Sequence, residues 1–299
     1  MRPIIPNLRK NGIFLALLGA TILAPDSLLM RLSGLSGPNM LFWRGLCSGI
    51  VYIGVWVFFE KPHLRQILRP FSASIFWLLI AFQVVNGAGF TIGIANAPVS
   101  SVLLGVATMP LMAAVLSAIF LNEKLTLRLT VTIGFVLAGL TLAMANKDGG
   151  ALALDRSTAF GALCGLAVAI SLAANFVIVR KNRDLPFPLG MGLGAILAGL
   201  LGLWMTQTTP FADLGSVLII AVTGAVIVPC SLFLLTLSSR YTSASNVSLI
   251  MLLETILGPI WVWAFLGESP TSFMLAGGSL VVTTLVFYLR NSGTIKTRL

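Results

Sequence analysis

Long apolar stretches alternate with short polar breaks along the whole chain. Ten of these stretches are about 20 residues long, the length that a helix needs to cross the hydrocarbon core of a bilayer, and prolines gather in the breaks. The pattern predicts an all-α membrane protein with ten transmembrane helices. The predicted spans are 12–32, 38–59, 72–94, 98–121, 126–145, 157–180, 187–206, 215–237, 243–266 and 271–290.

Composition supports this class. Hydrophobic residues make up 57% of the 299 positions and charged residues only 9%, with a mean hydropathy of +0.99, whereas a soluble chain carries about 25% charged residues. The net charge of +10 does not indicate nucleic-acid binding, because the basic residues form no run interleaved with aromatics. The three cysteines lie inside apolar stretches without metal-ligand spacing. We therefore expect no metal and no cofactor.

The basic residues also predict an orientation. With both termini in the cytoplasm, fifteen of the nineteen lysines and arginines fall on the cytoplasmic side, and Arg44 falls within a span. Only Arg31, Lys147 and Arg156 fall on the opposite side. This bias is the one expected of a correct span count. We expect a multi-pass protein of the bacterial inner membrane with cytoplasmic termini.

The chain contains an internal repeat. Phe120-Leu121-Asn122-Glu123 returns 145 positions later as Phe265-Leu266-Gly267-Glu268, and Gly12–Arg31 aligns with Gly161–Arg180. The interpretation is a first five-helix repeat at 1–146, a linker at 147–155 and a second repeat at 156–299. Because five spans is an odd number, the second repeat enters the membrane inverted. Secondary transporters commonly have this plan, with the substrate site between the halves; a non-transporting membrane scaffold is the alternative.

Several short motifs occur in a characteristic order. They are Pro38 with Phe42-Trp43-Arg44, Asn122-Glu123-Lys124-Leu125-Thr126 with Gly134 and Gly139, and Gly267-Glu268 with Pro270, Gly277 and Gly278. In these the chain resembles EamA-type drug/metabolite transporters, ten-helix proteins built from two inverted five-helix repeats. It looks most like the YddG branch, exporters of aromatic and other amino acids that also handle some cationic drugs. The resemblance implies a place at the cavity for Trp43 beside Arg44.

Glu254 is the carboxylate nearest the middle of the membrane. It lies about eleven residues into its span, roughly 16 Å deep, where a charge costs about 2.5–3.5 kcal/mol and needs a reason. Asn246 and Trp261 share its helix face by spacing and favour a cavity wall. In one interpretation Glu254 meets a substrate ammonium or carries a proton. In the other it is a protonated carboxyl bonded to a neighbouring helix.

Asp26 and Arg44 are expected at a shared depth, roughly 9 Å inside the same face of the membrane. An ion pair that locks the first two spans together is one interpretation. A gate, or recognition of a substrate carboxylate by Arg44, is another, and Arg44 could also extend outward to the interface.

Further polar residues follow helical spacing within the spans. Gln83, Asn86 and Phe90 do so in the third, Ser101 in the fourth and Asn175 in the sixth. Together they predict a pocket of amides and aromatics suited to an amino acid with a bulky side chain, although interhelical hydrogen bonding explains each one alone. Pro110, Pro229 and Pro259 are predicted to kink their helices. Glu123 and Glu268 are interpreted as structural caps of the helices that follow them.

Together these features predict a secondary transporter that exports aromatic and other neutral amino acids and related metabolites by alternating access. The alternatives are a proton-coupled exporter of drugs or organic cations, with Glu254 as the exchanging site, and a non-transporting scaffold. No catalytic triad or Walker loop is present in the sequence, so an enzyme is not expected. The expected partners are the small-molecule substrate and the lipid bilayer, with the chain acting as a monomer.

Overall fold

A computed structural model describes residues 12–60, 69–97, 99–123, 126–143, 156–206, 213–254, 257, 261, 265 and 272–292. Over these ranges the regular structure is helical, and each of the ten predicted spans contains a helix. The first half holds α1 (Gly12–Leu23), α2 (Asp26–Ser33), α3 (Gly37–Glu60), the 3₁₀ turn η2 (Arg69–Ser72), α5 (Ser74–Asn96), α6 (Val99–Val106), α7 (Met109–Leu121) and α8 (Leu127–Ala143). The second holds α9 (Arg156–Lys181), α10 (Phe187–Met205), α11 (Leu214–Val222), the π-turn η3 (Thr223–Ile227), α12 (Val228–Ser238), α13 (Ala244–Met251) and α15 (Ser272–Ser292).

Six helical segments within the described ranges are long and apolar enough to cross a membrane. Shorter apolar helices cover Met109–Leu121, Leu127–Gly139 and Ser279–Tyr288. The all-helical prediction therefore holds for the described residues, while the count of ten spans stays a prediction.

Prolines lie at three interruptions of the helices. A proline has no N–H to donate, and its ring displaces the carbonyl four residues earlier. Pro25 separates α1 from α2, Pro110 follows the break between α6 and α7, and Pro229 lies in the first turn of α12, just after η3. At the second break the Thr108 hydroxyl donates to the Gly105 carbonyl at 2.7 Å, which satisfies an acceptor at the end of α6. The predicted distortions at Pro110 and Pro229 are present; Pro259 lies outside the described residues, and the break at Pro25 was not predicted.

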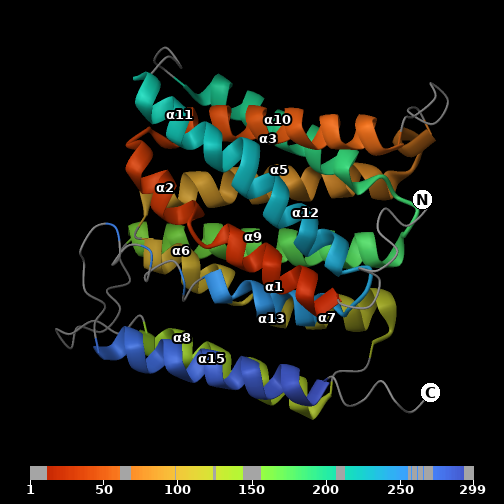
Figure 1. Cartoon of the computed structure of the whole chain (residues 1–299), viewed down its shortest axis with the longest axis vertical. Coiled ribbons are helices and arrows are strands. Elements are labelled where there is room, and N and C mark those ends of the chain that lie inside the picture. The colour runs from red at the N-terminus through yellow and green to blue at the C-terminus, as the bar shows by residue number, and fades with distance from the viewer. Residues whose placement is uncertain are drawn as a thin grey trace.

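The two halves of the chain interlock (Figure 1). The helix pairs with the most extensive packing are α3 with α10, α5 with α9, α6 with α9, α8 with α15, α5 with α10 and α1 with α12. Each of these pairs joins an element before residue 147 to one after residue 155. The pair α8 and α15 lies along one edge of the bundle in Figure 1, and α3 and α10 lie at the opposite edge. Any space at the centre is therefore bounded by both halves.

Glycines set the contact between α3 and α10. A Cβ on Gly45 would lie 2.6 Å from the Ala195 carbonyl oxygen and 2.7 Å from the Gly199 nitrogen. Such distances exclude any side chain, so the two backbones touch, as small residues allow in membrane helix pairs. Gly54, on the same helix, has nothing within 4 Å of its virtual Cβ.

Gly45→Val is expected to destabilise the protein by about 1–3 kcal/mol, because the added methyl groups force α3 away from α10. Thermal unfolding of detergent-purified protein measures the change, and Gly54→Val is the matched control, expected to behave as wild type. Equal melting temperatures for the two variants would contradict close packing at Gly45.

Candidate functional site

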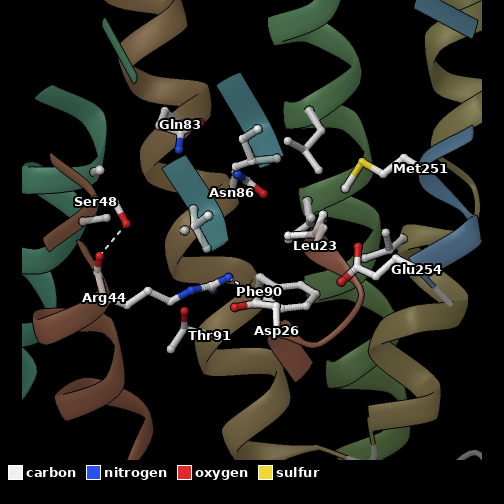
Figure 2. Close-up of a pocket in the computed structure, with 18 of the residues that line it drawn as sticks. Leu23, Asp26, Arg44, Ser48, Gln83, Asn86, Phe90, Thr91, Met251 and Glu254 are labelled. Carbon is white, nitrogen blue, oxygen red and sulfur yellow. Dashed lines mark hydrogen bonds and ion pairs between the residues drawn. The ribbon is translucent and has the colours of Figure 1, made fainter. Parts of the chain in front are cut away.

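A cavity lies between the two halves (Figure 2). About 850 Å³ of space lies between its lining atoms, a volume that includes open solvent at its mouth. Most of its wall is aliphatic side chains, methionines and Phe90. Its polar lining consists of Asp26, Arg44, Ser48, Gln83, Asn86, Thr91 and Glu254.

Asp26 and Arg44 form an ion pair in the wall of this cavity. Asp26 is the first residue of α2, directly after the break at Pro25, where the helix dipole favours a carboxylate. Arg44 Nη2 donates to Asp26 Oδ2; the Asp26 side chain is buried, and that of Arg44 keeps 11% of its exposure. The guanidinium lies 5.5 Å from the centre of the Phe90 ring, close enough for a cation–π contact. The structure thus forms the pair that the shared depth predicts and places it at the cavity.

Glu254 reaches the same cavity from the other half of the chain. It lies just beyond the end of α13 and is only 7% exposed. In Figure 2 the Glu254 side chain lies on one side of the Phe90 ring and the Asp26–Arg44 pair lies on the other. Within the described part of the chain, no hydrogen bond or ion pair holds the Glu254 carboxyl. The interpretation of Glu254 as a bond between helices therefore gains no support, whereas a role toward a ligand fits its position.

The third span contributes as its spacing predicts. Gln83, Asn86 and Phe90 of α5 all line the cavity. Gln83 Oε1 also accepts a hydrogen bond of 3.4 Å from Nδ2 of Asn175, which is buried in α9. Asn175 is absent from the lining, so the structure gives it the task of orienting Gln83 rather than a place in the wall.

Three other predicted cavity residues lie elsewhere. Asn246 donates to the Thr242 hydroxyl at 3.0 Å and accepts from the Tyr288 hydroxyl at 2.9 Å, which ties α13 to α15. Trp43 packs edge-on against the neighbouring Phe42 ring, with 5.1 Å between centres, and Trp261 is exposed beside Phe265. None of the three is among the lining residues, which corrects their placement.

The helix is interrupted between Asn246 and Glu254, which accounts for the Asn246 correction. The predicted face assumed one unbroken helix through Asn246 and Glu254, but α13 ends at Met251 and Leu252 forms a turn. A break between two residues removes the rotational relation that their spacing implies. The side chain of Ser101, also predicted to line the cavity, lies outside the described residues.

Sequence reasoning missed Ser48 and Thr91. The Ser48 hydroxyl donates to the Arg44 carbonyl at 2.6 Å, one turn earlier in α3. Thr91 stands eight residues after Gln83, and spacing of four and eight places Gln83, Gly87 and Thr91 on one helix face. That periodicity was the available signal for Thr91.

A second ion pair lies at the end of the bundle where α1 begins, here called the Gly12 end. Arg180 Nη2 donates to Glu123 Oε1 at 2.5 Å, and Nη1 donates to the backbone carbonyl of Thr242. This bridge links the ends of α7 and α9 to the turn before α13. It also corrects the cap predicted for Glu123, since the Thr126 hydroxyl, not that carboxylate, accepts from a backbone N–H of α8. Glu268 lies outside the described residues.

Comparison with known proteins identifies the family. The sequence profile of the EamA-like transporter family matches the chain twice, at residues 10–145 and 159–290. The chain belongs to the EamA-like transporter family. It is thus a multi-pass membrane transporter, and the family is one of transporters rather than enzymes.

Two individual comparisons agree with this family. An S-adenosylmethionine uptake transporter of Rickettsia bellii (strain RML369-C) is 24% identical over 259 residues, which covers 84% of this chain and 83% of the relative. A solved crystal structure described only as that of a protein matches with a TM-score of 0.75 and 15% identity, covering 93% of this chain and 95% of its own. At that identity the likeness concerns the fold alone.

Proposed function

We propose that this EamA-like protein is a secondary carrier that exports aromatic and other neutral amino acids and related metabolites, as in the YddG branch. It works by alternating access between two inverted five-helix repeats, in the bacterial inner membrane with both termini in the cytoplasm. The observation that carries the proposal is a cavity between the two halves with both signs of charge in an otherwise apolar wall. A zwitterionic head group with an apolar side chain matches that distribution.

The repeat arrangement has support from sequence and packing. The family profile matches each half separately, and the packed pairs fit a two-fold relation between the halves. In this relation α9 corresponds to α1, α10 to α3, α12 to α5 and α15 to α8. Exchanging the corresponding helices converts the pair α5–α9 into the pair α12–α1. The pairs α3–α10 and α8–α15 each exchange into themselves. Inverted repeats related in this way commonly enclose a transport site near mid-bilayer.

Alternating access needs contacts that close one end of the cavity and can break to open it again. The Arg180–Glu123 bridge fits this need, because it joins elements of both halves beyond the cavity and its side chains keep 24% and 31% of their exposure. A partly exposed pair contributes about 1 kcal/mol or less. Such a contact can break and re-form during each transport cycle.

Arg180→Gln is expected to raise access to the cavity from the Gly12 end by roughly two- to fivefold, in line with the energy of a partly exposed pair. The measurement is labelling of Ser48→Cys by an impermeant maleimide from each side, in a variant whose native cysteines are replaced by alanine. Arg128→Gln is the matched control, because Arg128 binds backbone carbonyls of α15 at the same end. Equal labelling in both variants would refute closure by Arg180.

Flux into and out of proteoliposomes tests the proposed function. Radiolabelled phenylalanine, tryptophan and leucine are expected to exchange across the membrane, with flux persisting when no pH gradient is applied. Flux of organic cations alone, dependent on opposed proton movement, would favour the proton-coupled drug exporter. No flux of any of these compounds from well-folded protein would favour a scaffold.

The Rickettsia relative provides a second candidate substrate. S-adenosylmethionine carries an α-amino acid group and a positive sulfonium centre, and the cavity has two carboxylates, Asp26 and Glu254, against one guanidinium. The formal excess of one negative charge suits a substrate with one net positive charge. Competition by S-adenosylmethionine against amino-acid flux, measured in both directions, distinguishes this uptake function from amino-acid export.

A further inference from the structure

The Asp26–Arg44 pair has only one of its two possible hydrogen bonds. A guanidinium and a carboxylate can form two parallel hydrogen bonds, yet the pair uses a single contact, Nη2 to Oδ2. Among the described residues, Asp26 Oδ1 and Arg44 Nε have no hydrogen-bond partner, although both atoms are buried. One acceptor and one donor are therefore unused in the cavity wall, and buried polar groups without partners are rare enough to need an explanation.

Thr91 adds a second unused donor at the same place. Its hydroxyl is fully buried and has no partner among the described residues. Other helical threonines donate to the carbonyl four residues earlier, as Thr132 and Thr141 do at 2.9 Å, which is the common arrangement. Figure 2 shows the Thr91 hydroxyl turned toward the Arg44 side chain instead.

We propose that Asp26, Arg44 and Thr91 form the receptor for the zwitterionic head group of an α-amino acid, with Thr91 as the residue that selects for its carboxylate. The inference rests on the proposed carrier function and adds the residues that bind the substrate's head group. The ammonium donates to Asp26 Oδ1, and the carboxylate accepts from Arg44 Nε and the Thr91 hydroxyl. As the head group enters, the Arg44 and Asp26 side chains separate and each exchanges its single mutual bond for bonds to the substrate.

This geometry distinguishes substrates that have both an ammonium and a carboxylate from those that have an ammonium alone. A substrate with an ammonium but no carboxylate satisfies Asp26 and leaves Arg44 Nε and Thr91 without partners, and unpaired buried donors are what polar sites use to reject an analogue. The apolar part of the substrate then faces Leu23, Met109 and Met251, which line the same cavity. The receptor thus favours free amino acids over the corresponding amines.

Binding to the purified, full-length protein tests the assignment with three probes: L-phenylalanine, L-phenylalaninamide and phenethylamine. Thr91→Val, which removes only the hydroxyl, is expected to weaken phenylalanine binding about tenfold or more, the usual effect of losing a hydrogen bond to a charged group. Binding of phenethylamine, which has no acceptor for the Thr91 hydroxyl, is expected to change less than twofold, and binding of L-phenylalaninamide, which has a neutral carbonyl acceptor, is expected to change less than that of phenylalanine. Thr91→Ser is expected to restore phenylalanine binding to within about threefold of wild type.

The control for these variants is Thr141→Val. Thr141 is exposed on α8 and its hydroxyl bonds to its own helix, so all three affinities should match wild type. If Thr91→Val weakens the three probes equally, or leaves phenylalanine binding unchanged, the Thr91 assignment is overturned. If the wild-type protein binds none of the three probes, the proposed amino-acid function fails as well, so the two failures are distinguishable.

Discussion

Glu254→Gln is expected to lower the flux of amine-bearing substrates about 10- to 100-fold, while expression and folding remain close to wild type. The carboxylate lies in the cavity wall and, among the described residues, bonds to none of them. Its loss removes a charged partner for the substrate ammonium, and hydrogen bonds to charged groups contribute about 1.5–3 kcal/mol. Glutamine keeps the size of the side chain, so the cavity should keep its shape.

The measurement is proteoliposome flux per folded molecule, with folding checked by thermal unfolding and size-exclusion chromatography. Asp213→Asn is the matched control. Asp213 caps the start of α11 through the backbone N–H groups of Gly215 and Ser216, outside the cavity lining, and asparagine caps helices equally well. A Glu254→Gln protein that expresses poorly but transports normally per folded molecule would identify Glu254 as a structural residue.

Asp26→Asn and Arg44→Gln are each expected to destabilise the protein by roughly 3–5 kcal/mol, because each leaves the other charge buried without its partner. The double variant Asp26→Asn/Arg44→Gln removes both charges and should be more stable than either single variant. Flux should stay low in all three, because each change removes a group that the head-group receptor uses.

Thermal unfolding of the four proteins, wild type included, gives the coupling between the two residues. A double variant less stable than both single variants would show that pairing is not what holds the two side chains in the wall. Near-normal flux in the double variant would contradict their role in substrate binding and leave a purely structural ion pair.

Much of the architecture was predictable because membrane insertion acts on each segment nearly independently. About 20 apolar residues make a spanning helix whatever its neighbours are, so each predicted span contains a helix among the described residues. Charges within such segments are costly wherever they point, so Asp26, Arg44 and Glu254 stood out and all three line one cavity. The repeat around Phe120 and Phe265 likewise marked the halves that the family profile matches separately.

Partners across helices depended on the three-dimensional arrangement. Asn246 accepts a hydrogen bond from Tyr288, and Glu123 forms an ion pair with Arg180. Neither contact was predicted, because the rotation of a helix and the position of its breaks decide which face meets which neighbour. Hydropathy carries little information on that rotation when a helix is apolar on all sides.

The amino-acid sequence alone determined the class of protein, the apolar segments and the charged residues that are costly to place inside a membrane. These follow from the free energy of transferring individual side chains into lipid, which is a local quantity. Only the tertiary structure decided that Asp26 and Arg44 share a single bond and that Thr91 turns its hydroxyl toward them. Hydrogen bonds depend on distances of a few tenths of an ångström between elements far apart in the chain, and packing alone sets those distances.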